Sequence, residues 1–216
     1  MDDGCARSLA RDTRRQAILE VARQVFMEDG FAAASMSAIA SRVGGSKGTL
    51  YNYFPSKHEL FAAVIQNECD LKQVALFDGL EASGDDVVAV LREVGRRYTQ
   101  LVLGEQVVVL TRVVIAESTR FPELGRVLYE AGPKRGRVRM AAYVTGQMAA
   151  GRLRQGDPMR MVDQFCDMCM SVLYRQRLMN VVDEPDEQMV ADNVEAAIEV
   201  ILAAYGPAGA ASSTTS

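Results

Sequence analysis

The sequence is poor in the residues that build metal and catalytic sites: its 216 residues include one histidine, His58. No second histidine is present to complete a metal site, and we expect His58 to be a polar residue in the first turn of a helix. A nucleophile elbow, an H-E-x-x-H helix, a dinucleotide fingerprint and a convincing pair of catalytic acids are also missing. The sequence therefore predicts no enzyme activity, no metal and no cofactor.

Long apolar runs are missing as well. The longest, around VVVLTRVVIA, is interrupted by Arg112, and the first twenty residues carry acids and arginines where a signal peptide would be apolar. With no export signal, we expect the four cysteines to be reduced thiols: Cys5, Cys69, Cys166 and Cys169. These features predict a cytoplasmic protein with no membrane partner.

The chain is slightly acidic overall, but its N-terminal region is basic. The net charge is −4, yet residues 4–58 contain eight Lys/Arg against four Asp/Glu, a local balance of +4. Because charge distribution matters more than the average, the acidic total does not exclude a nucleic-acid partner.

The sequence favours an all-α fold, because 49% of its residues are apolar and they recur at spacings of three and four. A capping box at Thr13 and Gln16 predicts the start of a first helix that stops at Gly30. Short helices over 37–43 and 47–54 follow, and SKHE at residues 56–59 opens a fourth. Further helices are expected at 86–103, 105–119, 122–150, 158–181 and 185–205, with breaks at Glu81–Asp86 and Gly132–Pro133.

The glycine-rich stretch GGSKGT, residues 44–49, is unlike a nucleotide-binding loop because Lys47 precedes Gly48 and a helix, not a strand, comes before it. Two short helices joined by Gly44 and Gly45 instead predict a helix-turn-helix, whose second helix would enter the major groove of DNA. This shape also occurs in proteins that never bind DNA, but a cluster of hydrogen-bond donors favours DNA here. The candidate contacts are Ser46, Lys47, Gly48, Thr49, Tyr51, Tyr53 and Lys57.

The stretch RRQAILEVARQVFMEDGFAAASMSAIASRVGGSKGTLYNYFPSKHELF resembles the DNA-binding domain of the tetracycline-repressor family over nearly fifty residues. The shared motifs are A-x-x-x-F-x-x-x-G-F, I-A-x-x-x-G, S-K-G-T-L-Y-x-Y-F and S-K-x-x-L. Gly45 departs from the family, which usually has a branched apolar residue there, and we expect a looser turn. Met36 stands where the family often has a hydroxyl, so Ser35 or Ser37 would supply that phosphate contact.

The resemblance implies a homodimeric, ligand-responsive transcription regulator, usually a repressor, that binds a near-palindromic double-stranded operator. It also implies a helix-turn-helix domain at 1–57 with an arm at about 1–12 and an effector-binding and dimerisation domain at 58–205. The last residues, 206–216, have no apolar anchor, and we expect a disordered tail there. Arg112–Pro133 is similar to regulators of efflux pumps, which implies a small hydrophobic effector. Candidate lining residues are Tyr98, Phe121, Met140, Tyr143, Met148 and Phe165.

The apolar stripe of the last helix and the apolar helix before it offer more surface than one chain can cover, which favours a two-fold four-helix interface. The stripe would serve equally to cover the chain's own core. Candidate interface residues are Cys166, Val172, Leu173, Val190, Val194, Ile198, Ile201 and Leu202. The competing function is a helical small-molecule-binding protein or enzyme with an apolar cavity and no role on DNA.

Overall fold

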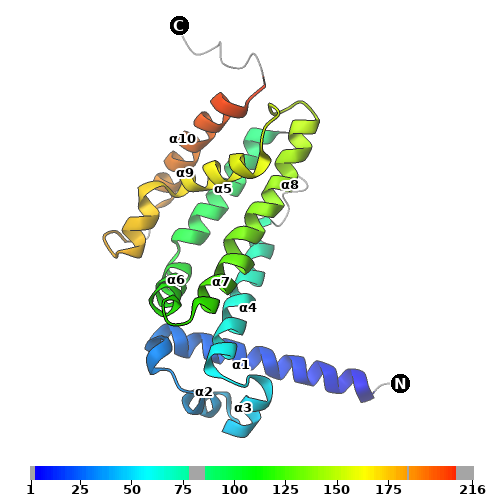
Figure 1. Ribbon diagram of the computed structural model, residues 1–216, viewed down its shortest axis with the longest axis vertical. Helices are drawn as coiled ribbons and strands as arrows, with labels where there is room; N and C mark the ends of the chain where they lie inside the picture. The colour runs from blue at the N-terminus through cyan, green and yellow to red at the C-terminus, as the bar shows by residue number, and fades with distance from the viewer. Residues whose placement is uncertain (1–2, 78–85, 184, 208–216) are drawn as a thin grey trace. The chain divides into compact units, whose positions relative to one another are not determined.

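The computed structural model describes residues 3–77, 86–183 and 185–207, with side chains from Ser8 onward. Within these ranges every regular element is a helix, as the sequence predicts (Figure 1). The chain forms two compact units. Unit 1 contains the chain up to Asp70 together with Val109–Ala131, and unit 2 contains Leu71–Val108 together with the chain from Gly132. Most of the predicted break at Glu81–Asp86 and of the predicted tail lies outside the described residues.

The first helix, α1 (Asp3–Ala33), begins ten residues before the predicted start. The predicted capping box at Thr13 is wrong, because the Thr13 hydroxyl donates back to the Leu9 carbonyl at 2.9 Å inside the helix. Most of the predicted N-terminal arm is therefore helical. Gly30 interrupts the helix as predicted: its φ of 75° and ψ of 164° are not helical.

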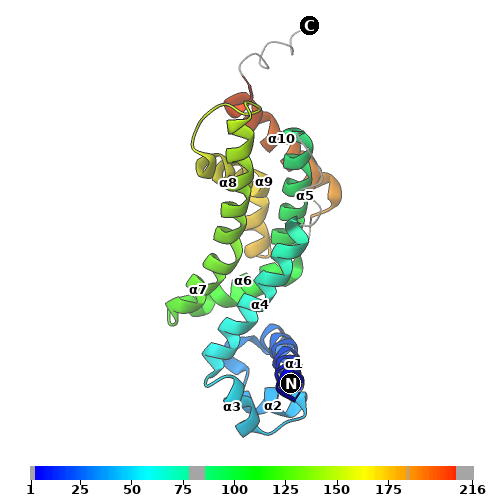
Figure 2. The same ribbon diagram turned by 90° about the vertical axis from the view of Figure 1, so that its right-hand side faces the viewer.

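Helices α2 (Met36–Val43) and α3 (Lys47–Tyr53) form the predicted helix-turn-helix. Ser35 caps α2 by accepting from the Ala38 amide at 3.1 Å, and Ser46 caps α3 by accepting from the Thr49 amide at 3.0 Å. Gly44 ends α2 in the left-handed conformation, with a φ of 72° that favours glycine. Figures 1 and 2 both place α2 and α3 beside α1.

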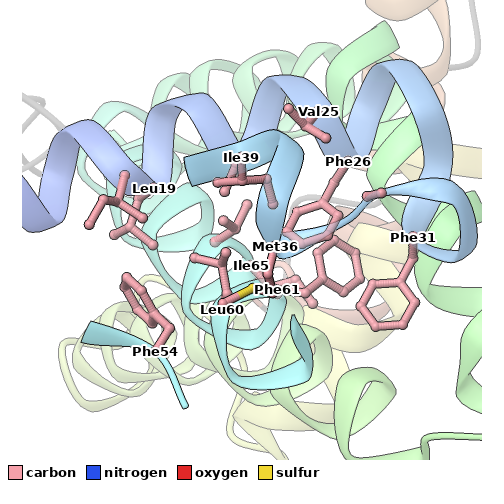
Figure 3. Packing of buried hydrophobic residues seen from close by; sticks show 14 of the residues in the cluster. Leu19, Val25, Phe26, Phe31, Met36, Ile39, Phe54, Leu60, Phe61 and Ile65 are labelled. Atoms are coloured by element: carbon pink, nitrogen blue, oxygen red, sulfur yellow. The ribbon is translucent and has the colours of Figure 1, made fainter. Parts of the chain in front are cut away.

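The core of unit 1 is built around an aromatic cluster (Figure 3). Phe26 lies 4.8 Å from Phe61 and 5.7 Å from Phe31, measured between ring centroids. Phe61 belongs to α4 (Lys57–Phe77). Ser56 caps the N-terminus of α4, because its hydroxyl oxygen accepts from the Glu59 amide at 3.1 Å. The predicted capping residue of this helix is thus confirmed, and the core holds α1 to α4 in place around the turn.

Unit 2 is a bundle of α5 (Val87–Leu103), α8 (Arg135–Ala149), α9 (Pro158–Leu178) and α10 (Glu187–Tyr205). Helix α9 packs against the other three, and α5 also packs against α10 (Figure 2). Gly95 allows α5 to approach closely, because a Cβ there would lie 2.8 Å from Val194 and 3.0 Å from Phe165. Buried Arg177 ties the end of α9 to the end of α5 by donating to the Leu103 carbonyl at 3.1 Å.

The remaining helices are α6 (Glu105–Ser118) and α7 (Pro122–Tyr129), followed by a π-helical segment, η2 (Glu130–Lys134). The predicted break at Gly132–Pro133 falls in η2 and is confirmed. In the described part of the chain no single helix is long and apolar enough to span a membrane, although the bent pair α5–α6 has the required length and composition.

Candidate nucleic-acid interface

Helix α3 buries one side and exposes the rest. Leu50 is 2% exposed and Phe54, directly after the helix, is 3% exposed. The opposite side is open, since a helix places residues three and four apart on one face. The exposed residues in this segment are Ser46, Lys47, Gly48, Thr49, Tyr51 and Asn52.

Gly48 lies near the middle of this open side. A Cβ at Gly48 would meet only the Ser46 hydroxyl, at an ordinary 3.7 Å, so the fold itself does not require glycine there. A missing side chain instead lets a large ligand come close to the helix backbone. This arrangement suits a helix that enters a groove.

The polar groups beside Gly48 are partly organised by one another. The Ser46 and Thr49 hydroxyls lie 2.9 Å apart and share a hydrogen bond, and Lys47 Nζ lies 5.8 Å from the centroid of the Tyr51 ring. At the start of α2, Ser37 is exposed and Met36 is buried. Ser35 uses its hydroxyl oxygen as the α2 cap, which leaves its O–H available as a donor.

Lys57 is placed differently from the sequence expectation of a phosphate contact. Its ammonium donates to the carbonyls of Phe31 at 2.6 Å, Ala34 at 2.9 Å and Ala32 at 3.2 Å. It also lies 4.5 Å from the Phe31 ring centroid. An ammonium has three N–H donors, so in this structure Lys57 has none left for a phosphate. Lys57 therefore binds the carbonyl end of α1.

Arginines from α1 lie along α3. Arg11 is 6.0 Å from the ring centroid of half-buried Tyr53, and Arg15 is 5.3 Å from that of Phe54. Arg14 donates to the Gly44 carbonyl in the turn at 3.2 Å. None of these three has a carboxylate partner among the described residues, so their charge is not neutralised locally.

Two other arginines of unit 1 are paired with acids. Arg42 bonds Glu28 at 2.7 Å, and Arg23 bonds Glu20 at 2.9 Å. The hydrogen bond from Arg23 lowers the pKa of the Glu20 carboxyl, so both members of this pair are charged at neutral pH. Among the described residues, arginines without a carboxylate partner therefore lie beside α3, at Arg11, Arg14 and Arg15.

Sequence reasoning missed Asn52 and the arginines of α1 as members of this surface. Asn52 follows Gly48 by four residues and so shares its face, opposite Leu50. That spacing could have identified Asn52 from the sequence. The positions of Arg11, Arg14 and Arg15 could not be identified in this way, because they depend on how α1 packs against α3.

The predicted effector residues do not all come together. Met140, Met148 and Phe165 are buried in the core of unit 2, and Tyr98 and Tyr143 pack against that core. Phe121 belongs to unit 1, where its ring lies 3.9 Å from the His58 ring and 6.1 Å from the Phe31 ring. The effector-binding roles of all six residues stay predictions.

The two neighbouring thiols are poorly suited to redox sensing. Burial raises the pKa of Cys166 to about 12, and burial also raises the pKa of Cys169. Both groups therefore stay protonated at neutral pH, and a thiol reacts far more slowly than a thiolate. In the structure they are small residues of the unit 2 core.

Most of the predicted interface residues are buried within the single chain. Six of them are almost fully covered by their own chain, and their role in a dimer stays a prediction: Cys166, Leu173, Val190, Val194, Ile198 and Ile201. Val172 remains 48% exposed and Leu202 is half-buried. Val172 lines an open groove of ≈ 650 Å³ between α9 and α10, together with Val200, Ala204 and Tyr205.

A helix-turn-helix with an exposed second helix, unpaired arginines beside it and a separate helical unit defines a helix-turn-helix transcription regulator. Residues 18–64 match the model of the bacterial regulatory proteins of the tetR family, and residues 89–207 match the C-terminal domain of AefR-like transcriptional repressors. The chain belongs to the tetR family. It is a DNA-binding transcription regulator, and members of this family are not enzymes.

Individual relatives agree with this assignment. The chain is 48% identical over 62 residues to the transcriptional activator FasR of Mycolicibacterium smegmatis, covering 29% of this chain and 28% of FasR. It is 33% identical over 119 residues to the regulator UidR of Escherichia coli K12, covering 55% of this chain and 58% of UidR. These matches thus span less than two thirds of either relative.

Solved structures match over nearly the whole chain. The flavonoid-responsive regulator FrrA is 34% identical, with a TM-score of 0.78, over 91% of this chain and 99% of FrrA. A tetR-family regulator from Mesorhizobium loti has a TM-score of 0.83 at 24% identity, over 90% of this chain and 98% of that chain. The second likeness concerns the fold alone.

Proposed function

We propose that the protein is a homodimeric cytoplasmic repressor that leaves its operator when a small, mainly hydrophobic effector binds. The observation that carries the DNA-binding part is the exposed side of α3, where Gly48 opens the backbone and polar donors surround it. Two α3 helices of a dimer would enter successive major grooves about 34–36 Å apart. A near-palindromic operator follows from the two-fold symmetry.

The proposed DNA contacts have two roles. Ser35, Ser37, Ser46, Thr49 and Tyr51 carry hydroxyl donors suited to phosphates, with Tyr53 beside them, and such contacts position the protein without reading sequence. Lys47 supplies charge, and Asn52 can form two hydrogen bonds with an adenine edge. Lys57 is left out of the contact set because its donors already bind carbonyls.

For the effector, we propose an apolar or aromatic compound bound in the core of unit 2 near Tyr98, Tyr143 and Phe165. Phe165 is part of the apolar core of unit 2, and Tyr98 and Tyr143 pack against that core. FrrA, 34% identical over most of its length, is named for its response to flavonoids. An effector changes operator affinity only if it binds the two conformations of the protein unequally. The AefR-like family model, described as a repressor, favours repression over activation.

For the dimer, we propose the exposed face of α9 and α10 around Val172 and Val200 as the contact between two copies. The groove there is open, and Val172 and Val200 in its lining are 48% and 54% exposed in one chain. A two-fold axis along this face would place four helices side by side, which is a common way to bury such a surface.

The function is tested by selecting duplexes from a random library with the purified protein, then measuring mobility shifts with the selected duplex. We expect enrichment of a near-palindrome and a shift that a panel of hydrophobic compounds, flavonoids included, relieves. A library that shows no enrichment, or a shift that no salt concentration weakens, would contradict a phosphate-binding operator complex.

Tyr51→Ala provides the matching variant, with Tyr129→Ala on α7 as its control because both tyrosines are exposed. We expect Tyr51→Ala to lower affinity for the selected duplex while circular dichroism stays unchanged, and Tyr129→Ala to leave affinity unchanged. Equal affinity of the wild type and Tyr51→Ala would remove α3 from the interface.

A further inference from the structure

Arg14 occupies the space that a side chain at position 45 would fill. Its Nη2 atom lies 2.8 Å from where a Cβ at Gly45 would be, closer than two such atoms can approach. Nη2 also donates to the Gly44 carbonyl at 3.2 Å. The guanidinium therefore lies across the turn between α2 and α3 because residue 45 has no side chain.

The backbone does not explain the glycine at position 45. Gly44 has a φ of 72° and needs glycine, whereas Gly45 has no positive φ and any residue could adopt its conformation. The turn is also closed normally, since the Gly45 amide donates to the Ala40 carbonyl at 3.0 Å. The guanidinium of Arg14 occupies the space beside Gly45 that a side chain would fill.

The position of Arg14 suits an anionic partner. One of its five N–H donors is accounted for by the Gly44 carbonyl, and no described carboxylate pairs with it. It lies beside exposed Ser46 at the start of α3, while Arg11 and Arg15 flank the other end of the same helix. A guanidinium matches the paired oxygens of a phosphate well.

We propose that Arg14 binds a phosphate of the DNA backbone next to the groove that α3 enters, and that Gly45 makes this contact possible. The inference rests on the proposed role of α3. Since phosphate contacts carry no sequence information, Arg14 strengthens binding to all duplexes and orients α3. A bulkier residue at position 45 moves the guanidinium away from the turn.

The test measures binding of Arg14→Ala to the duplex selected by the wild type, across a series of salt concentrations. The slope of log K against log salt is negative, and each lost phosphate contact makes it shallower by about 0.9. The ratio of wild-type affinity to Arg14→Ala affinity should therefore fall about 3.5-fold per protomer when salt rises from 50 to 200 mM. Arg160→Ala, an exposed arginine on α9, is the charge-matched control and should keep the wild-type slope.

Gly45→Ala provides the second arm. Its Cβ meets only the flexible end of Arg14, so the variant should fold with an unchanged melting temperature. We expect it to lower the salt slope in the wild-type background and to have no effect in the Arg14→Ala background. This dependence on Arg14 distinguishes the proposal from a general role of the turn.

Two results would overturn the proposal. In the first, Arg14→Ala keeps the salt slope of the wild type. In the second, Gly45→Ala changes the salt slope equally whether residue 14 is arginine or alanine. If either occurs while Tyr51→Ala still loses affinity, α3 binds DNA and only the role of Arg14 is wrong. If Tyr51→Ala also keeps full affinity, the proposed interface itself is wrong.

Discussion

At the scale of single residues, unit 1 uses its cations in three ways. Arg23 and Arg42 pair with nearby acids, Lys57 binds the carbonyl end of α1, and Arg14 has no acidic partner among the described residues. All four carry the same charge in the sequence. Their neighbours decide which of them is available to a ligand, so a charge count alone overestimates the number of cations available to a phosphate.

Lys57→Met tests the structural role of Lys57. Methionine keeps much of the length but loses the three hydrogen bonds to carbonyls, and we expect the free energy of unfolding to fall by about 1.5–3 kcal/mol. Urea denaturation measures this loss. The salt slope of DNA binding should stay at the wild-type value.

Lys47→Met is the control for this prediction, because Lys47 is exposed and its ammonium lies near the Tyr51 ring, 5.8 Å from the ring centroid. Lys47→Met should make the salt slope of DNA binding shallower and leave the free energy of unfolding unchanged. If Lys57→Met instead makes the salt slope shallower and keeps the wild-type free energy of unfolding, Lys57 is a phosphate contact after all.

Asn52→Ala tests base reading. Alanine favours helix, so the fold should be unaffected. If Asn52 binds an adenine edge, discrimination at one base pair should fall by about 1–3 kcal/mol while the salt slope stays unchanged. Competition between the selected duplex and its single-base variants measures this, with Gln66→Ala on α4 as the control. Retained discrimination at every position would exclude Asn52 as a base reader.

At the scale of helices, caps and breaks were predictable where a side chain acts on its own backbone. Ser46 and Ser56 cap α3 and α4, and Gly132–Pro133 interrupts the helix as expected. The start of α1 was not predictable from Thr13, because a threonine hydroxyl can also bond within a helix. Local signals therefore identify helix ends only when no alternative hydrogen bond competes.

Gly95→Ala tests the close packing of α5. A Cβ there would clash with Val194 and Phe165, neither of which can move freely in the core, and we expect a loss of about 1–3 kcal/mol in unfolding free energy. Gly146→Ala on α8 is the control: no atom lies within 4 Å of its Cβ, so it should stabilise by about 0.5–1 kcal/mol. Thermal melts of both variants check the difference, and a stabilised Gly95→Ala would contradict this packing.

At the scale of the whole molecule, the apolar stripe of α10 illustrates the limit of periodicity. The stripe that the sequence reveals most strongly, including Val194 and Ile198, covers the chain's own core. The weaker apolar face with Val200 is left exposed. A pattern shows that a face is apolar, and the tertiary structure decides whether the same chain or a second copy covers it.

Val200→Glu tests the proposed dimer. A charge buried between two copies costs far more than one exposed to water, so we expect light scattering to report a monomer at micromolar concentration with the fold intact. Val74→Glu on α4 is the control, since Val74 is also an exposed valine, outside the groove. It should keep the mass of the wild type. A dimeric Val200→Glu, or a monomeric wild type, would exclude this interface.

Much of the fold was predictable from the sequence because its signals are local. Apolar spacing predicts the helices, and the exposed side of α3 follows from its short sequence once Leu50 and Phe54 are assigned to the core. The donors of Lys47, Thr49 and Tyr51 were identified for the same reason. These features depend on neighbours within one or two helical turns.

Only the tertiary structure decided which polar and apolar groups remain free. Lys57 meets carbonyls 23 to 26 residues away, and Arg14 meets a glycine turn 30 residues away. No local sequence pattern predicts contacts between residues this far apart in the chain, because both contacts depend on how the helices pack. The sequence by itself determined the helices and the motif, and packing determined which charges and which apolar face are left to bind another molecule.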